Sequence, residues 1–455
     1  MVHKFNLFGN NIVYDANANS LHVFNGVAAE LLDAWQTERG AFDSGAVAAT
    51  EKKYGPGDTA EATDEIRSLV ESGQLFARDE GGPDAASLEN SHVFKSLCMH
   101  LAHDCNMKCA YCFASEGSFG LERGLMDYET ACAAIDFVTK ASAGRTNIEI
   151  DFFGGEPLLN YDVLKRTVEY ARQNEKKHGK KFRFTLTTNG LLLDDDVVDY
   201  VNANMDNLVL SIDGRREVND RLRKRLDGSG TYEYIVDRFL SVTRKRESSW
   251  YVRGTYTVLN KDFAADVLHL ADLDFDRLSV EPVVSPMDPA LGFSPDDLAA
   301  LSEEYEKLAY AIYERGLQGK PIDFFHFNVD LEGGPCAARR IKGCGAGYEY
   351  AAVTPNGDIY PCHQFAGIEQ FCLGDVFNGI TNHEMVSRMK NNNIYAKPEC
   401  RACWAKYLCG GGCAANAWYY NHDIDMPDPF YCNLFRKRME CALWLACAQS
   451  LQQPL

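Results

Sequence analysis

Apolar and polar positions alternate along residues 93–317 in a way that predicts strands and helices in turn. Short apolar runs are typical of buried strands, and the segments between them repeat their apolar positions with a helical period. Six such strand–helix units predict an α/β domain with a parallel sheet and right-handed crossovers. An open, partial (β/α)6 TIM-like barrel suits six units better than a closed barrel of eight. The strand-like runs are FKSLCMHLAH, IEIDFFGG, FRFTLTTNG, NLVLSIDG, YVRGTYTV and RLSVEPVV.

The chain before this domain has a different pattern. Residues 1–90 begin with strand-like runs separated by Asn/Gly turns in KFNLFGNNIVYDANANSLHVFN. Helical periods follow in GVAAELLDAWQ and ATDEIRSLVESGQLF, and then a strand-like LFARD. Strands and helices in a segment of this size predict a winged-helix-like domain. The acidic stretch at 39–64 matches no pattern that we can assign.

The alternation is lost again towards the C-terminus. Residues 320–455 are rich in Gly and Cys, as metal-stapled folds are, and end in the helical segment YCNLFRKRMECALWLACAQ. The predicted organisation is therefore three domains, at 1–90, 91–319 and 320–455.

Composition narrows the possible functions. Hydrophobic residues make up 46 % of the 455 residues, which is enough for a large core. The net charge of −19 argues against a nucleic acid as the main partner. No apolar run reaches the roughly 18 residues of a membrane helix, and the N-terminus does not resemble a signal peptide. We therefore expect no membrane partner and a cytoplasmic location, where the 16 cysteines serve metal sites or redox chemistry rather than disulfides.

Three of these cysteines form a CxxxCxxC array directly after the first predicted strand. Cys105, Cys109 and Cys112 lie in LAHDCNMKCAYCFASEG, with Tyr111 before the last of them. Ligands of parallel α/β sheets bind at the carboxyl ends of strands, so the array lies at the ligand edge. Three thiolates leave either a zinc site or a 4Fe–4S cluster incomplete. The spacing favours a cluster with one iron open to an outside ligand; the alternative is zinc completed by a distant His or Cys.

The second predicted strand ends in DFFGGEP. Gly154 and Gly155 allow a ligand to approach the backbone closely, and Glu156 offers a carboxylate to an amino group. Together with CxxxCxxC and its aromatic residue, this ending resembles the radical S-adenosylmethionine (SAM) enzymes. The resemblance implies that the amine and carboxylate of SAM occupy the open iron. It also implies that an electron from the cluster cleaves SAM to methionine and a 5′-deoxyadenosyl radical.

Further contacts with SAM follow from the same resemblance. It implies that Ser211 of SIDG and an arginine after it touch the cofactor, and spacing favours Arg223 over Arg221. Asn189 of TTNG could reach the ribose, although capping the turn after its strand is an equal alternative. Glu281 ends the sixth strand in the barrel mouth, where it either binds substrate or orders polar groups. We assign no catalytic acid or base, because the cofactor carries the chemistry.

The C-terminal cysteines form a second field, with the pattern C-x12-G-x4-C, then C-x2-C-x5-C-x3-C, then a last C. Seven cysteines exceed the ligands of one tetrahedral metal, so two sites are expected. The pattern resembles the SPASM extension, which holds auxiliary 4Fe–4S clusters in radical SAM enzymes that act on peptides; a zinc ribbon is the alternative. By analogy, an outer cluster is held by Cys400, Cys403, Cys409 and Cys432. An inner cluster is held by Cys344, Cys362 and Cys413.

The inner set lacks a fourth ligand. Cys336, eight residues before Cys344, is one candidate. The other is a thiolate of the substrate, with Cys336 uninvolved. Together with the CxxxCxxC array, the chain is thus expected to hold three 4Fe–4S clusters in addition to SAM. The cysteines without cluster spacing are expected to be structural; they are Cys98, Cys132, Cys372, Cys441 and Cys447.

Along its full length, from HKFNLFGNNIVYD through SVEPVV to AVTPNGDIYPCHQF, the chain looks like the SCIFF (six-cysteine peptide) maturases. That family implies thioether cross-links from a cysteine sulfur to the α-carbon of an acceptor residue in a ribosomally made, cysteine-rich precursor peptide. The N-terminal domain resembles the element that takes the leader of such a peptide as an added strand; a structural cap or dimerisation domain is the alternative. An electron donor such as a flavodoxin or ferredoxin is implied as well.

Two other functions compete with this one. An anaerobic sulfatase maturase shares the core and the SPASM pattern but oxidises a Cys or Ser side chain to formylglycine and makes no cross-link. The N-terminal domain argues against it, because a peptide clamp is more useful for a leader than for a folding sulfatase. A non-catalytic iron–sulfur or zinc scaffold that binds peptides would need neither the GGEP ending nor an open iron.

Overall fold

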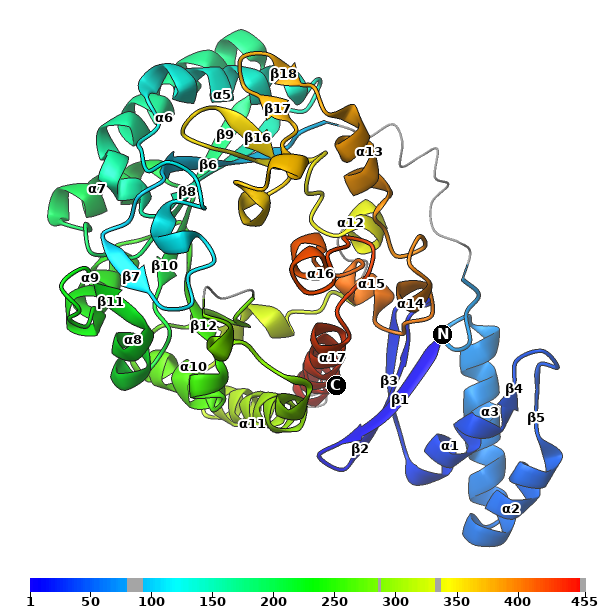
Figure 1. Cartoon of the computed structure of the whole chain (residues 1–455). Helices are drawn as coiled ribbons and strands as arrows, with labels where there is room; N and C mark the ends of the chain where they lie inside the picture. The colour runs from blue at the N-terminus through cyan, green and yellow to red at the C-terminus, as the bar shows by residue number, and fades with distance from the viewer. Residues whose placement is uncertain (80–92, 285–287, 332–336, 451–455) are drawn as a thin grey trace.

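The computed structural model describes residues 1–79, 93–284, 288–331 and 337–450 (Figure 1). Its centre is an 11-stranded sheet in the order β14-β13-β12-β10-β9-β8-β6-β15-β16-β17-β18. The six strands predicted for the central domain lie side by side and parallel in this sheet, which confirms the α/β class. They are β6 (Ser96–Ala102), β8 (Asn147–Gly154), β9 (Lys181–Thr188), β10 (Asn207–Ser211), β12 (Ser249–Tyr256) and β13 (Arg277–Pro282).

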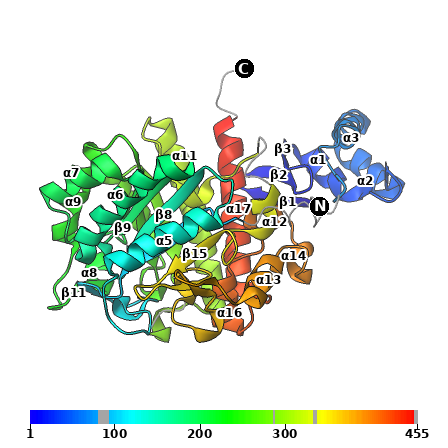
Figure 2. The same cartoon turned by 90° about the horizontal axis from the view of Figure 1, so that it is seen from above.

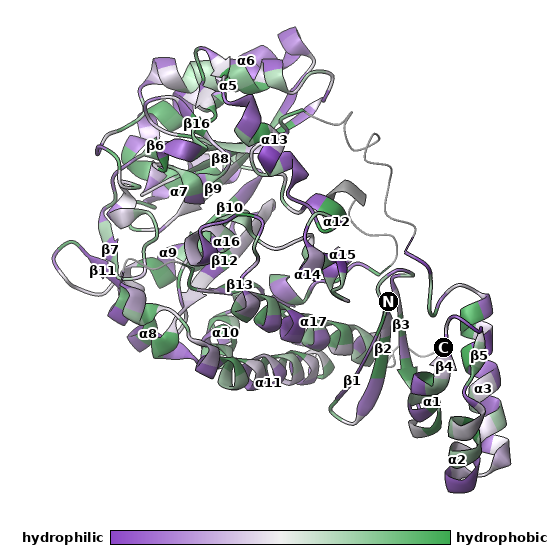
Figure 3. Ribbon diagram, turned by 45° about the vertical axis from the view of Figure 1, so that its right-hand side comes forward, coloured by the Kyte–Doolittle hydropathy of each residue, from purple (hydrophilic) through white to green (hydrophobic). Residues whose placement is uncertain are grey.

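Helices cover the outer face of this sheet, and their sequences explain why. In α6, Leu164, Val168 and Ala171 are spaced three to four residues apart and are buried in the central core. Figure 3 shows hydrophilic and hydrophobic residues on the same helices, as expected for helices with one buried side. The helices of the central domain are α5 (Tyr128–Ala141), α6 (Tyr161–His178), α7 (Asp195–Asn204), α8 (Arg216–Leu222), α9 (Tyr232–Arg244), α10 (Phe263–Asp272) and α11 (Leu298–Leu317).

Side chains alternate between the two faces of the sheet. In β9, Phe182, Phe184 and Leu186 are buried in the core, which turns Thr185 and Thr187 to the opposite, inner face. The neighbouring strand β8 alternates in the same way, with Ile150 and Phe152 in the core and Asp151 between them on the inner face. A separate two-stranded ribbon lies at the carboxyl edge of the sheet and consists of β7 (Met107–Cys109) and β11 (Arg223–Arg225).

The C-terminal domain is hydrogen-bonded into the same sheet. β15 runs parallel to β6, with Tyr350 beside Ser96 and Val353 beside Met99. The last helix, α17, packs against α11. The strands of this part are β14 (Asp323–Phe324), β15 (Tyr350–Val353), β16 (Asp358–Tyr360), β17 (Gly374–Asp375) and β18 (Gly379–Ile380). The helices are α12 (Ala337–Lys342), α13 (His383–Asn391), α14 (Pro398–Arg401), α15 (Lys406–Cys409), α16 (Ala414–Asn421) and α17 (Pro429–Ser450).

Residues 1–79 form an N-terminal module with an apolar core of its own. Three antiparallel strands in the order β1-β2-β3 lie beside three helices and a short hairpin. The stretch at 39–64 that matched no pattern supplies β5, α2 and the start of α3. The elements are β1 (Val2–Leu7), β2 (Asn10–Asp15), β3 (Ser20–Phe24), α1 (Gly26–Leu31), β4 (Trp35–Gln36), β5 (Ala41–Phe42), α2 (Ser44–Tyr54) and α3 (Pro56–Glu71).

The strand predicted for LFARD, at 75–79, is wrong. These residues have no strand partner within the described chain, and Phe76 has a positive φ of 53°, which breaks an extended run. The backbone N–H of Ala77 donates to Asp15 Oδ2 at 3.0 Å, so a side chain satisfies it in place of a strand.

The N-terminal module docks on α17 and on the cysteine-rich segment beside it (Figure 2). The His3 ring of β1 stacks on Trp404, with ring centroids 3.9 Å apart. Trp444 Nε1 of α17 donates to Asn10 Oδ1 at 3.1 Å. Among the described residues, no helix is both long enough and apolar enough to span a membrane.

Candidate functional site

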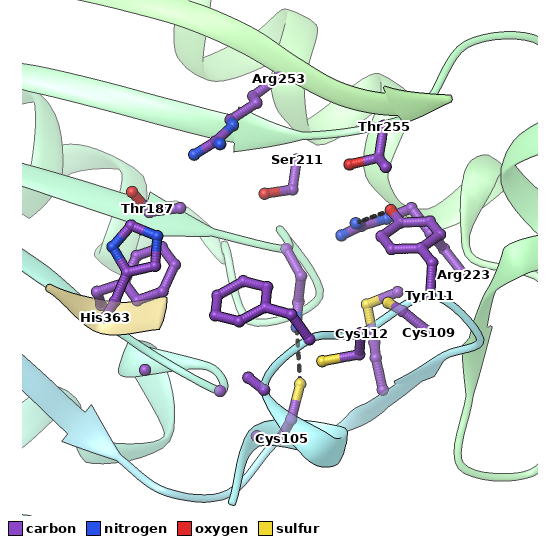
Figure 4. Close-up of a pocket in the computed structure, with 18 of the residues that line it drawn as sticks. Cys105, Cys109, Tyr111, Cys112, Thr187, Ser211, Arg223, Arg253, Thr255 and His363 are labelled. Carbon is purple, nitrogen blue, oxygen red and sulfur yellow. Dashed lines mark hydrogen bonds between the residues drawn. The ribbon is translucent and has the colours of Figure 1, made fainter. Parts of the chain in front are cut away.

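The CxxxCxxC array occupies the loop after β6, at the carboxyl edge of the sheet (Figure 4). Pairing of β7 with β11 sets Cys109 opposite Arg223. Cys105, Cys109 and Cys112 line one cavity of about 200 Å³, so the structure brings the three predicted ligands together. Burial raises the pKa of the Cys105 and Cys109 thiols to about 12. A bound metal centre would supply the positive charge that holds such thiols as thiolates.

Two glycines bring the end of β8 against this loop. The Gly155 N–H donates to Ala102 O at 2.8 Å, and a Cβ built on Gly155 would lie 2.1 Å from Asp104 O. Gly154 has a φ of +126°, and a Cβ there would lie 2.3 Å from Ala102 O. Only glycine fits such an approach, so bare backbone forms this wall of the cavity.

Glu156 lies behind that wall. It is fully buried and accepts hydrogen bonds from Thr188 Oγ1 (2.9 Å), Asn189 N (2.8 Å) and Leu158 N (3.1 Å). Burial raises its pKa to about 7. Within the described chain, the cavity lining includes Thr188 and Asn189 but not Glu156. These hydrogen bonds join Glu156 to the end of β9, and a contact of its carboxylate with SAM stays a prediction.

Asn189 caps the turn after its strand and also lines the cavity. Its Oδ1 accepts from Leu191 N at 3.1 Å, as the capping alternative expected. Its Nδ2 donates to Asn106 Oδ1 at 2.8 Å and lies 3.8 Å from Cys105 Sγ. The cap thus fixes an amide group at the cavity wall, beside the cysteine loop.

A buried polar cluster supports the opposite wall. Tyr111 OH lies 2.8 Å from both carboxylate oxygens of Asp213, and Arg223 Nη1 donates to Tyr111 OH at 2.9 Å. Arg223 lines the cavity, and its buried Nε has no hydrogen-bond partner among the described residues. A buried N–H without a partner fits a ligand that brings an oxygen acceptor, as SAM does. Arg221, the other arginine considered, lines a different cavity beside Arg215.

Polar side chains on the inner face of the sheet complete the cavity. The strand register places Ser211 beside Arg253 and Thr255 beside Glu281. Arg253 Nη2 donates to Glu281 Oε2 at 2.6 Å, and Figure 4 shows the Arg253 side chain reaching into the cavity near Ser211. The two side chains are 38 % and 36 % exposed, so a ligand in the cavity can contact both. Sequence reasoning did not single out Arg253; its signal is the one charge inside YVRGTYTV.

The Arg253–Glu281 pair is charged at neutral pH. Burial disfavours a carboxylate at Glu281, but the neighbouring cationic groups, Arg253 foremost, together outweigh burial and lower the pKa of Glu281 to about 2. Glu281 in turn raises the pKa of Arg253. The cavity therefore presents a hydrogen-bond donor and an acceptor side by side.

His363 enters the same cavity from the C-terminal domain. It begins the short 3-10 helix η8 (His363–Phe365), directly after Cys362. Its ring centroid lies 5.5 Å from that of Phe113 and 5.1 Å from that of Phe153. Burial lowers its pKa to about 4, so the ring is neutral at pH 7. The sequence analysis did not predict a role for His363. Its position next to Cys362, a predicted inner ligand, is the feature that could have indicated one.

The four cysteines predicted for the outer site line a second cavity, of about 160 Å³. Lys406 and Arg436 line it too, and Arg436 Nη1 lies 3.9 Å from Cys403 Sγ. Cationic side chains around a group of thiols fit an anionic metal–thiolate centre. The cysteines in this cavity are Cys400, Cys403, Cys409 and Cys432.

The inner cysteines that the structure describes also lie close together. Burial raises the pKa of the Cys362 thiol, and Cys413 and Cys344 lie near enough to raise it further. Cys336 lies outside the described residues, so its role stays a prediction. Within the described ranges, no three His, Cys, Asp or Glu side chains are placed to hold a single metal ion. Three of the cysteines expected to be structural are buried, namely Cys98, Cys441 and Cys447.

Known families match both cysteine regions. Residues 99–274 match the Radical SAM superfamily, and residues 344–404 match SPASM, an iron–sulfur cluster-binding domain. A cysteine-type anaerobic sulfatase-maturating enzyme of Clostridium perfringens is 24 % identical over 362 residues, which cover 74 % of this chain and 93 % of the relative. The mycofactocin maturase MftC of Mycolicibacterium smegmatis is 25 % identical over 347 residues, covering 73 % of this chain and 81 % of the relative.

Solved structures share the fold. Histidine-tagged anSMEcpe with bound AdoMet has a TM-score of 0.64 at 22 % identity, and the match covers 79 % of this chain and 98 % of that one. SuiB of Streptococcus suis bound to precursor peptide SuiA has a TM-score of 0.54 at 15 % identity. That match covers 92 % of this chain and 96 % of SuiB, a share that cannot be reached without part of the N-terminal module.

Proposed function

The chain is a radical SAM superfamily enzyme with a SPASM domain, and we propose that it installs thioether cross-links in a ribosomally made, cysteine-rich precursor peptide. Each cross-link joins a cysteine sulfur to the α-carbon of an acceptor residue. In this proposal the enzyme works in the cytoplasm, its N-terminal module binds the leader of the peptide, and a flavodoxin or ferredoxin supplies electrons.

The residues around the cavities fit the cofactors that this chemistry needs. Cys105, Cys109 and Cys112 would hold the first cluster, beside the bare Gly154–Gly155 backbone and the unpartnered Nε of Arg223. Bound SAM and its cluster supply one-electron chemistry that removes a hydrogen atom from a C–H bond. The outer four cysteines, and the inner cysteines with a fourth ligand, would hold the auxiliary clusters.

The chain's own residues would position the peptide. Arg253 can donate to a carbonyl of the substrate backbone while Glu281 accepts from an N–H, because the pair carries both groups at one wall of the cavity. His363 and the two phenylalanine rings around it make the adjoining wall less polar and limit the access of water. These residues orient the acceptor residue rather than react with it.

The N-terminal module is the observation that carries the proposal. It has an apolar core of its own and packs on α17, and its sheet has β1 and β3 as edge strands. An edge strand offers unpaired backbone groups that an extended peptide can join. In the structural comparisons, SuiB with its precursor peptide matches 92 % of this chain, whereas anSMEcpe with bound AdoMet matches 79 %.

A second candidate is formylglycine formation on a sulfatase. Its support is the sequence likeness to cysteine-type anaerobic sulfatase-maturating enzymes, which extends over nearly the whole length of those relatives. This reaction would use the same first cavity and the same auxiliary sites, but it does not explain why the chain has an N-terminal module.

The deciding experiment is anaerobic. The reconstituted enzyme is incubated with SAM, a strong reductant and a candidate cysteine-rich precursor peptide, and the peptide is then weighed and fragmented. Thioether formation removes two hydrogens, so a loss of about two mass units per cross-link is expected, with the change placed between a cysteine and an α-carbon.

Other results would point elsewhere. Conversion of a sulfatase-derived peptide to an aldehyde, with the precursor peptide unchanged, would favour the second candidate. Release of 5′-deoxyadenosine without any change in peptide mass would leave the radical SAM core in place and contradict the substrate. No SAM cleavage at full iron content would contradict both enzyme functions.

Removing one outer cysteine should lower the iron content by about a third, because one of three clusters is lost. Cys400→Ala is the variant, and Cys132→Ala, outside every predicted ligand set, is the matched control. Iron and acid-labile sulfide per chain after anaerobic reconstitution measure the effect. Equal iron in the two variants would contradict the assignment of Cys400.

A further inference from the structure

The segment between two outer cysteines, residues 404–408, meets the N-terminal module at two points. At one of them the ring of His3 stacks on Trp404 with an interplanar angle of 4°. At the other, Asp79, near the end of the module, forms an ion pair with Lys406. A short stretch of chain inside a predicted cluster-binding loop therefore touches both the first strand and the last described residue of the module.

Asp79 is held by three donors. Lys406 Nζ donates to Oδ2 at 2.5 Å, and the hydroxyls of Tyr395 and Tyr407 lie 3.1 Å from Oδ1. The side chain of Lys406 is 1 % exposed and that of Asp79 is 30 % exposed. A buried ammonium group is costly without a partner of opposite charge. In the described chain, the carboxylate of Asp79 supplies this opposite charge for Lys406.

Lys406 also lies between two of the outer cysteines in the chain and lines their cavity. It opens α15, which ends at Cys409, and it lines the same cavity of about 160 Å³ as the four predicted ligands. A centre held by thiolates becomes more negative on reduction. A nearby ammonium therefore favours the reduced state, and a nearby carboxylate disfavours it. Asp79 and Lys406 thus act on the potential of this site in opposite directions.

We infer that the Asp79–Lys406 pair tunes the midpoint potential of the outer auxiliary cluster and so connects the N-terminal module with electron transfer. The inference rests on the proposed assignment of the outer cluster to its four cysteines. Both residues are positioning residues, since they act through their charges and bind neither substrate nor cofactor. Because such coupling is reciprocal, a peptide on the module that separates Asp79 from Lys406 would raise the midpoint potential.

The test is an anaerobic redox titration of the full-length, reconstituted enzyme, followed by electron paramagnetic resonance. The signal of the outer cluster is identified as the one missing in Cys432→Ala. Asp79→Asn should move its midpoint to a more positive potential, and Lys406→Met should move it to a more negative one. Asp64→Asn is the matched control, because Asp64 belongs to the same module, is 77 % exposed and pairs with Arg67. The midpoint potential of the outer cluster in this variant should equal that of the wild type.

Wild-type midpoints in both Asp79→Asn and Lys406→Met, at full iron content, would overturn the inference. Asp79 is partly exposed, so Asp79→Asn keeps the test decisive even if the buried Lys406→Met does not fold. If Cys432→Ala loses neither iron nor a signal, the assignment of the outer cluster falls and the inference falls with it. The mass of the peptide product tests the proposed thioether chemistry independently of the midpoint potentials and of the iron content.

Discussion

Replacing Gly155 with alanine should lower SAM cleavage by about a hundredfold, equivalent to about 2.7 kcal/mol. The new Cβ would lie 2.1 Å from Asp104 O and 2.9 Å from Gly117 Cα. Both are backbone atoms and cannot rotate away, so either the end of β8 or the cysteine loop must move. A displacement of about 1 Å at a reacting site can cost about a hundredfold in rate. Chromatography of released methionine and 5′-deoxyadenosine measures the loss.

Gly144→Ala is the control for this variant. Gly144 lies between α5 and β8 in the same domain, and a Cβ there would meet nothing within 4 Å. Its SAM cleavage should stay within about twofold of the wild type. If Gly155→Ala takes up full iron and cleaves SAM at the wild-type rate, the close approach of β8 to the loop does not form the SAM site.

Glu281→Gln should lower kcat/KM for the precursor peptide by about thirtyfold, or about 2 kcal/mol. The substitution keeps the size of the side chain but removes the charge that pairs with Arg253, and it leaves a guanidinium unpaired at the cavity wall. Because the pKa of Glu281 is held at about 2, the wild-type carboxylate is ionised throughout the neutral range. The loss should therefore be the same on the acid and alkaline sides of pH 7. Initial rates of peptide conversion by mass spectrometry provide the measurement.

Two further variants separate peptide binding from folding. Glu233→Gln removes a carboxylate that pairs with Arg216 at 2.8 Å on the exposed surface, and its effect should stay within about twofold. The double variant Arg253→Met/Glu281→Gln removes the unpaired charge, so its thermal stability should recover towards that of the wild type. Peptide conversion should stay low in this double variant. Recovery of both properties together would show that the pair serves folding alone.

Features that depend on near neighbours in the chain could be predicted from the sequence. Alternation with a period of two, as in FRFTLTTNG, identified β9, because each side chain of a strand faces away from the next. The cysteine loop and the Gly154–Gly155 pair were recognisable because the spacing of a few residues sets their geometry. The α/β class and the radical SAM and SPASM domains follow from such local patterns, and the family comparisons confirm them.

Contacts between distant parts of the chain could not be predicted in this way. Arg253 and Glu281 are 28 residues apart, and Asp79 and Lys406 are 327 residues apart, so no spacing rule joins either pair. The strand predicted at 75–79 failed for a related reason. Its composition suits a strand, but the backbone is held by the distant Asp15 in a conformation that no strand allows.

The parallel pairing of β15 with β6 limits how the polypeptide can be divided. Six of the seven residues of β6, Leu97–Ala102, are buried. A fragment cut after residue 319 would keep this apolar strand but lose its neighbour β15, and the exposed edge would template aggregation. A chimera that exchanges the C-terminal domain for that of a relative must match the foreign strand to β6 in register and in packing. For expression and recombination, the barrel and the cluster-binding domain therefore behave as one inseparable piece.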